Sequence, residues 1–436
     1  MHAEAVYGKK KGAIGAGLVV VVVVLGFVAA RAVALEEGEG EGETPFLGHP
    51  ADTDMNWRLV MSEAIGYLAG WQAGSNPMAY ATRAAYLWQN GEMYTYNANG
   101  DPPMWWALPV QPDLPELVDV PADTFQMGDP REEGYLDEKP VHDVYLDAYQ
   151  IGKYEVTNQQ YAEVLNWAHG QGYLKNFGGD TPYTNGVIYA YDQFITYTAD
   201  IHPDTSQITY SDGIFGVRSR AGYGDVLYSM ADHPVGGVSW YGAVCYCNWL
   251  SEQQGLQPCY DTMTWTRYEP VRNGYRLPTE AEWERAAAWD GTRHWHFGIT
   301  SDTIDITRAN CHYFEGGYAN PLGLKDQPFT APVGWYNGVN PSRVGWPRLT
   351  MNATSPVGAY DMSGNVWEWC HDWWYRMYTT EPVINPTGPT WGSGRMLRGG
   401  FMLYDNGDGS RTTFRGVRST PGGLNAFHGF RISRTP

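Results

Sequence analysis

Glycine and large aromatic residues dominate this sequence, while charged residues are sparse. The 436 residues include 52 glycines, 19 tryptophans and 31 tyrosines, and only 18% of the chain is charged. Glycine favours turns and loops, and buried aromatic rings supply large contact areas that fix loops in place. The composition therefore predicts a loop-rich fold pinned by aromatic side chains, and it excludes α-solenoids and coiled coils. A chain of this length allows roughly two to four folding units.

The balance of charges is strongly acidic. The chain has 29 Lys and Arg against 48 Asp and Glu, a net charge of −19. Such a surplus repels phosphate backbones and anionic headgroups, so we expect no nucleic-acid partner and cations as the favoured small partners. The five cysteines form no Cys-x-x-Cys pair, and we expect them to be buried or to form one disulfide.

The first 34 residues carry a targeting pattern. Three lysines at residues 9–11 precede an uncharged stretch over residues 12–30, and small residues follow it. This order is typical of a secretory signal peptide. The stretch of 19 residues is also long enough to span a bilayer as an uncleaved anchor. Both alternatives predict an extracytoplasmic protein, secreted or at the cell surface, with a membrane contact only through an uncleaved segment.

Two segments follow before the main part of the chain. Residues 36–43 alternate Glu and Gly, which predicts a solvated acidic linker over residues 35–47. Residues 48–110 then contain an EF-hand-like calcium spacing, with oxygen side chains at loop positions 1, 3, 5 and 12 and a backbone carbonyl at position 7. We predict one calcium ion bound by the residues at these positions, Asp52, Asp54, Asn56, Arg58 and Glu63.

A second interpretation of this loop stays open. Trp57 occupies position 6, where glycine normally makes the turn. Asp52 and Asp54 then serve only as caps of the helix that follows. The segment resembles a single dockerin-type half-repeat, and a Pro-rich run over residues 109–121 marks its boundary with a large domain over residues 111–436.

Hydroxyl residues mark three predicted helix starts in the large domain. Thr157 and Thr279 are each followed three residues later by Gln160 or Glu282, which is the pattern of a capping box. Ser239 precedes the third helix. The positive end of the helix explains the carboxylates after Thr279 better than acid–base catalysis does. Five tryptophans are predicted to be packing anchors where these helices and nearby turns meet the core: Trp240, Trp249, Trp283, Trp367 and Trp369.

Eight motifs follow one another in the large domain, at residues 125–128, 141–149, 154–158, 233–240, 275–284, 361–369, 398–400 and 429–431. Together they resemble the formylglycine-generating enzyme (sulfatase-modifying factor) family. The resemblance implies an α+β, C-type-lectin-like fold with little regular secondary structure. Here this fold is preceded by the small calcium-loop helical segment and the N-terminal signal or anchor.

The turn over residues 361–368 is a candidate metal site. Two carboxylates and two carbonyls within a Gly-containing turn can converge on one hard cation. The matching positions of the family bind calcium, so the resemblance implies side-chain ligation by Asp361 and Glu368 and carbonyl ligation by Gly364 and Val366. A second calcium site of the family maps onto Asn310, Cys311 and Asp326, although the loop there is one residue shorter than expected.

The resemblance fails at the catalytic site. The aerobic enzymes of the family hold copper(I) through two thiolates shortly after the Gly-Gly pair of a late motif, and soft sulfur ligands are what copper(I) selects. In this chain the stretch over residues 399–411 contains no cysteine, and Tyr404 and Gly409 take the two places by count. We therefore expect calcium as the cofactor and no copper.

Two functions remain open. The first is a secreted, calcium-stabilised pseudoenzyme with a binding or structural role, which recognises a peptide, protein or glycan and has the capacity to self-associate. The second is an extracytoplasmic oxidoreductase or protein-modifying enzyme of the wider family. No phosphate loop, His-Glu-x-x-His motif or Ser-His-Asp order supports another enzyme class.

Overall fold

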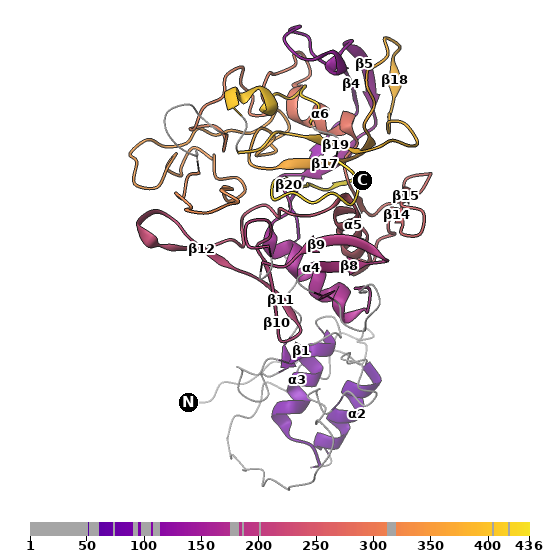
Figure 1. Cartoon of the computed structure of the whole chain (residues 1–436). Helices are drawn as coiled ribbons and strands as arrows, with labels where there is room; N and C mark the ends of the chain where they lie inside the picture. The colour runs from indigo at the N-terminus through magenta and orange to yellow at the C-terminus, as the bar shows by residue number, and fades with distance from the viewer. Residues whose placement is uncertain are drawn as a thin grey trace, which may run out of the picture. The chain divides into compact units, whose positions relative to one another are not determined.

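The chain divides into two compact units, residues 1–111 and residues 112–436, which Figure 1 shows in a computed structural model. The predicted signal or anchor and the acidic linker lie outside the described residues. In the part of the chain that is described, no helix is long and apolar enough to cross a membrane. The structure describes residues 51, 61–72, 75–89, 95–96, 106–107, 114–174, 183–184, 187–199, 202–311, 320–402, 405–416 and 419–436.

The N-terminal unit contains two packed helices, α2 (Met61–Gln72) and α3 (Met78–Gln89). The turn between them is held by Asn76, whose Nδ2 donates to the carbonyl of Tyr67 at 2.9 Å. A short ribbon follows, in which β1 (Thr95–Tyr96) pairs antiparallel with β2 (Trp106–Ala107).

The C-terminal unit is built mainly from short strands joined by loops. Its first strands are β3 (Leu117–Val120), β4 (Asp123–Met127), β5 (His142–Leu146), β6 (Tyr149–Gly152), β7 (Tyr183–Thr184), β8 (Val187–Ala190), β9 (Gln193–Tyr197), β10 (Ile208–Ser211), β11 (Ile214–Val217), β12 (Ser219–Ala221) and β13 (Leu227–Ser229). The later strands are β14 (Tyr260–Asp261), β15 (Thr266–Arg267), β16 (Tyr275–Arg276), β17 (Trp367–Trp373), β18 (Val383–Ile384), β19 (Arg395–Arg398), β20 (His428–Gly429) and β21 (Ser433–Arg434).

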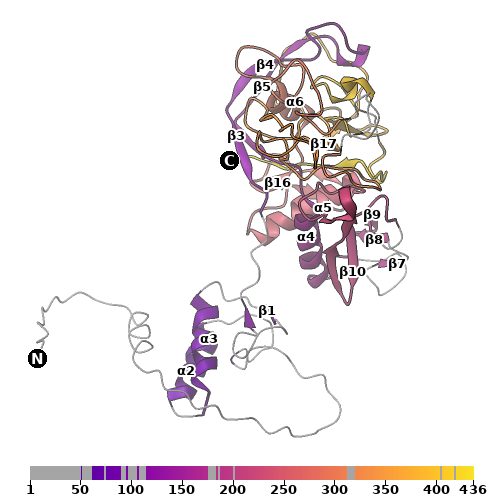
Figure 2. The same ribbon diagram turned by 90° about the vertical axis from the view of Figure 1, so that its left-hand side faces the viewer.

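These strands form small, mostly antiparallel sheets. The largest has the strand order β16-β21-β6-β3, and three-stranded sheets have the orders β18-β5-β4, β19-β17-β20 and β7-β8-β9. Parallel pairs occur where β17 meets β20 and where β18 meets β5. In Figure 2, β3, β4 and β5 run along one edge of the unit. The expected α+β fold with little regular secondary structure is therefore observed, and its sheets include both antiparallel and parallel pairs.

Three α-helices lie among the described residues of this unit, and each begins where the sequence predicts. Thr157 caps α4 (Asn158–Gly170) and Thr279 caps α6 (Glu280–Ala288), each with a complete capping box. Ser239 caps α5 (Trp240–Gln253), and its hydroxyl accepts from the N–H of Gly242. Short 3-10 turns occupy Leu136–Glu138, Tyr223–Asp225 and Asp405–Ser410.

Aromatic side chains fill the core, as the composition predicts. One cluster packs α5 against β9 and α4, and it includes Trp240 and Trp249. A second cluster packs Trp283 of α6 against the buried faces of β4 and β5. All five predicted anchors are buried, with exposed fractions of 4% or less: Trp240, Trp249, Trp283, Trp367 and Trp369.

Candidate functional site

The turn over residues 361–368 leads into β17 and ends in a fully buried ion pair. Arg431 grips Glu368 with two parallel bonds, from Nε to Oε2 at 2.6 Å and from Nη2 to Oε1 at 2.7 Å. Trp283 Nε1 also donates to Oε2 at 2.8 Å. A carboxylate buried in this way is stable only because its charge is paired and hydrogen-bonded.

Two further carboxyl groups lie beside this pair. Asp361 accepts from the N–H of Gly334 at 2.6 Å, and Glu155 accepts from Asn365 Nδ2 at 2.8 Å. Burial raises the pKa of Asp361 to about 6, and Glu368 adds to the rise. Burial, Asp361 and Glu368 raise the pKa of Glu155 well above its usual value. Three carboxyl groups thus share one arginine. A cation bound beside them would lower the raised pKa values of Asp361 and Glu155.

The structure brings residues of the two predicted calcium sites together. Gly364 has φ +95°, and a Cβ placed on it would lie 2.6 Å from the carbonyl oxygen of Asn310. The same Asn310 carbonyl accepts from the N–H of Asn365 at 2.9 Å. The Oδ1 atom of Asn310 is buried and has no hydrogen-bond partner among the described residues. Such an orphaned oxygen is a donor group that suits calcium.

The remaining predicted ligands of these two calcium sites include Glu368, Cys311 and Asp326. The Glu368 carboxylate accepts two hydrogen bonds on Oε2 and one on Oε1. One lone pair on Oε1 therefore remains free. Cys311 is buried, whereas Asp326 is exposed. Within the described ranges, no three His, Cys, Asp or Glu side chains are grouped to hold a metal ion, so any calcium site there needs backbone carbonyls as well.

Only one predicted ligand of the N-terminal loop can be located. Glu63 lies in the first turn of α2, which is the predicted position of the last loop ligand. Asp52, Asp54, Asn56 and Arg58 lie outside the described residues.

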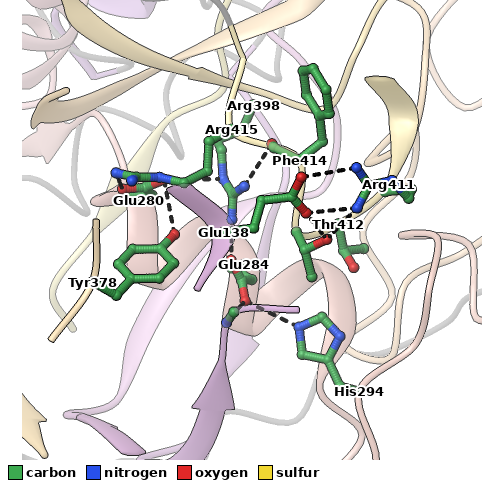
Figure 3. Close-up of polar contacts among 12 residues, drawn as sticks. Glu138, Glu280, Glu284, His294, Tyr378, Arg398, Arg411, Thr412, Phe414 and Arg415 are labelled. Carbon is green, nitrogen blue, oxygen red and sulfur yellow. Dashed lines mark hydrogen bonds and ion pairs between the residues drawn. The ribbon is translucent and has the colours of Figure 1, made fainter. Parts of the chain in front are cut away.

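Three arginines at or near the ends of residues 399–411 in the sequence, Arg398, Arg411 and Arg415, each pair with a glutamate (Figure 3). Arg411 is bound to Glu138 by bonds of 2.6 and 2.9 Å, and Thr413 donates to the same carboxylate at 2.6 Å. Arg415 is bound to Glu280 by bonds of 2.8 and 2.9 Å. These contacts fasten the C-terminal segment to α6 and to the loop that contains Glu138.

The network continues through Glu284 in the middle of α6. Its carboxylate contacts Arg398 and lies 3.1 Å from His294 Nε2 (Figure 3). Burial would raise the pKa of Glu284, but Arg398 and His294 lower it to about 2. Glu284 is therefore ionised throughout the physiological range, and the network is a permanent set of paired charges rather than an acid–base pair.

The two carboxylates lie in the first turn of α6, as predicted, and they also bind arginines. The helix terminus is not their only partner, because Arg276 binds Glu282 through bonds of 2.6 and 2.7 Å and Arg415 binds Glu280. Arg276 and Glu282 lie in the same motif over residues 275–284, whereas Arg415 is 135 positions from Glu280 and no local pattern joins that pair.

Asp372 carries the clearest pH dependence outside the predicted metal ligands. Its Oδ2 accepts from the N–H of Glu280 at 2.8 Å, and burial together with Glu280 raises its pKa to about 7. The unfolded carboxyl has a pKa of about 3.9. The folded state therefore holds the proton more tightly, and stability falls as the pH rises from about 4 to about 7.

Replacing Asp372 by Asn should remove this penalty. The amide oxygen can still accept from Glu280, so we expect Asp372→Asn to raise the unfolding free energy by roughly 4 kcal/mol at about pH 8 and to change it little at about pH 4. Urea denaturation at both pH values measures the difference. The exposed Asp212→Asn is the matched control, and an Asp372→Asn protein with the parent's pH dependence would contradict the assignment.

The fold and the site together define a class: an α+β domain with mixed small sheets and a core of capped helices and buried arginine–glutamate pairs. The family model for the sulfatase-modifying factor enzyme 1-like domain matches residues 107–436, and the chain belongs to this family. The resemblance stated from the eight motifs is confirmed.

Similar proteins carry two kinds of name. The formylglycine-generating enzyme of Thermomonospora curvata is 28% identical over 331 residues, covering 73% of this chain and 93% of that enzyme. The "Serine/threonine-protein kinase pkn1" of Chlamydia caviae is 29% identical over 327 residues, and the match spans 74% of this chain but only 38% of the kinase. Among solved structures, Treponema denticola variable protein 1 matches at 24% identity and a TM-score of 0.46, covering 73% of this chain and 95% of that one.

Proposed function

We propose that this chain is a secreted or cell-surface protein in which a formylglycine-generating-enzyme-like domain, stabilised by calcium, has a binding or structural role and no copper chemistry. The placement of the cysteines carries this proposal. The five thiols are all outside residues 399–411, and each is buried and free: Cys245, Cys247, Cys259, Cys311 and Cys370.

The chemistry of these thiols supports the same conclusion. Copper(I) is held by thiolates, so a ligating cysteine needs a low pKa or a metal that displaces its proton. Burial raises the pKa of Cys311 to about 12 and that of Cys370 well above its usual value. These are properties of small apolar core residues rather than of copper ligands.

The donor chemistry around residues 361–368 supports calcium. The cluster offers carboxylate and amide oxygens, carries more negative charge than Arg431 balances, and includes the orphaned Oδ1 of Asn310. Asp361, Glu368 and the carbonyls of Gly364 and Val366 would hold the ion, and its charge would neutralise the buried carboxylates. For the N-terminal loop we propose a second calcium ion at Asp52, Asp54, Asn56, Arg58 and Glu63.

An activity assay tests the absence of copper chemistry. The protein is incubated with copper(I), oxygen and a Cys-x-Pro-x-Arg peptide, and mass spectrometry follows the conversion of the peptide thiol to formylglycine. We expect no conversion, whereas the Thermomonospora curvata enzyme serves as the positive control. Turnover comparable to that control would overturn the proposal.

An extracytoplasmic oxidoreductase or protein-modifying enzyme is the second candidate. The observation that favours it is the match across 93% of a relative named formylglycine-generating enzyme. Metal analysis of the purified protein separates the two. Calcium without copper or iron supports the binding protein, and stoichiometric copper or iron supports the enzyme.

A further inference from the structure

A cleft of about 510 Å³ opens at the N-terminal end of α4, next to the carboxylate cluster. This volume is within the range of small-molecule sites. Two backbone bonds fix its position, because the N–H of Asn158 donates to the carbonyl of His233 at 2.9 Å and the N–H of Val333 donates to that of Asp232 at 2.9 Å. The first turn of α4, Asp232 and the loop that contains Val333 therefore form one rigid wall.

The charges that line the cleft have one sign. Its described lining includes Glu116, Glu155 and Asp232 but no Lys, Arg or His. Glu116 is paired with Lys153 at 2.8 Å, and Glu155 accepts from Asn365. The carboxylate of Asp232 receives no hydrogen bond or ion pair from the described residues. Asp232 is thus a carboxylate that remains available to a cation in the cleft.

A buried amide in the same wall is also available. Gln160 is 8% exposed and lines the cleft. Its Oε1 accepts from the N–H of Thr157 at 3.0 Å and completes the capping box, but its Nε2 donates to no described group. The Nε2 atom itself is reachable from the cleft, so it is free to donate to a ligand there. The Gln160 Nε2 therefore points to a ligand with an acceptor atom, such as a carbonyl.

An ammonium group of the chain itself already lies at the rim. Lys153 Nζ is 5.2 Å from the centre of the Tyr154 ring and 2.8 Å from Glu116, both of which line the cleft. Carboxylates combined with aromatic faces favour alkylammonium groups over bare ions, because the ring attracts the cation and the stem is covered. Apolar walls suited to such a stem are supplied by Leu114, Pro115, Pro332, Val333 and Trp335.

We propose that this cleft binds an aliphatic primary ammonium group that carries a neighbouring carbonyl, as a lysine side chain in an extended peptide does. The ammonium group pairs with Asp232, the aliphatic stem lies on Val333 and Trp335, and the carbonyl accepts from Gln160 Nε2. The net charge of −19 adds a long-range attraction for such ligands.

The test is calorimetric titration of the full chain at saturating calcium. The probe is Nα-acetyl-lysine methylamide, and the matched neutral probe is Nα-acetyl-norleucine methylamide. We expect the lysine probe to bind at least about tenfold more tightly than the norleucine probe and to weaken as salt increases. n-Butylammonium, which lacks the carbonyl, should bind more weakly than the lysine probe. Equal affinity for the lysine and norleucine probes would overturn the proposal, and so would a lysine probe that binds only when the titration is repeated without calcium.

Two variants test the individual contacts. Asp232→Asn should weaken the lysine probe about tenfold, whereas Asp212→Asn should not. Asp212 is an exposed residue at the β10–β11 turn, which contacts His169 at the C-terminal end of α4. The length of α4 separates that end from the cleft by about 18 Å. Gln160→Glu keeps the capping box but removes the Nε2 donor, so the preference for the lysine probe over n-butylammonium should disappear. Unchanged binding of the lysine probe in both cleft variants would show that the cleft is not the binding site.

Discussion

Replacing Arg431 by methionine is expected to lower the unfolding free energy of the C-terminal domain by about 3–5 kcal/mol. The guanidinium is fully buried, grips Glu368, and donates to the carbonyls of Gly152 and Tyr360 at 2.9 Å each. Without it, Glu368 is left as an unpaired buried charge beside two other carboxyl groups. Since a domain of this kind is stable by about 5–15 kcal/mol, the variant should be close to unfolding.

Urea denaturation at neutral pH measures this loss. Lys153→Met is the matched control, since Lys153 also pairs with a glutamate but the Glu116 partner is 59% exposed. A surface pair contributes about 0–1 kcal/mol, so the control should shift the urea midpoint only slightly. Equal shifts for the two variants would show that the buried pair has no special role.

Calcium is expected to raise the unfolding free energy by about 2.7 kcal/mol at a hundredfold excess over its Kd. The physical reason is the surplus of buried carboxylates at Glu155, Asp361 and Glu368, which one arginine does not neutralise. Denaturation curves in calcium and in EDTA measure the effect. Identical curves would contradict a calcium-stabilised domain.

Two substitutions assign the calcium response to a set of ligands. Asp361→Asn should remove most of it, because it withdraws a charged oxygen from the turn over residues 361–368. Asp326→Asn tests the second predicted set, in which Asp326 is exposed while Asn310 and Cys311 are buried. If Asp326→Asn removes the response and Asp361→Asn leaves it intact, the ion belongs to the second set.

Local signals were readable from the sequence, and long-range partners were not. The capping boxes at Thr157 and Thr279 need only two residues three positions apart, so their helices could be placed correctly. The pairing of Glu138 with Arg411 joins residues 273 positions apart and has no local pattern. A single sequence also gave no reason to choose Arg431 among 29 basic residues as the partner of Glu368.

In the candidate site, too, the local turn was predicted from the sequence and the long-range partners were not. Spacing placed two carboxylates and a glycine in one turn, and the structure confirms that Gly364 adopts a positive φ there. Glu155, whose carboxylate lies against this turn, comes from a segment 210 residues earlier and was not predicted. The cleft beside it was missed for the same reason, since its walls come from four separate parts of the chain.

The position of β21 in its sheet has a consequence for synthesis. This strand lies between β16 and β6, and Arg431 just before it reaches back 279 residues to the carbonyl of Gly152. Translation at about 5–20 residues per second completes β6 roughly 15–60 seconds before β21 is synthesised. During that interval the edges of β6 and β16 are open to wrong pairings. Folding of this domain should therefore be late, slow and dependent on whatever protects the nascent chain.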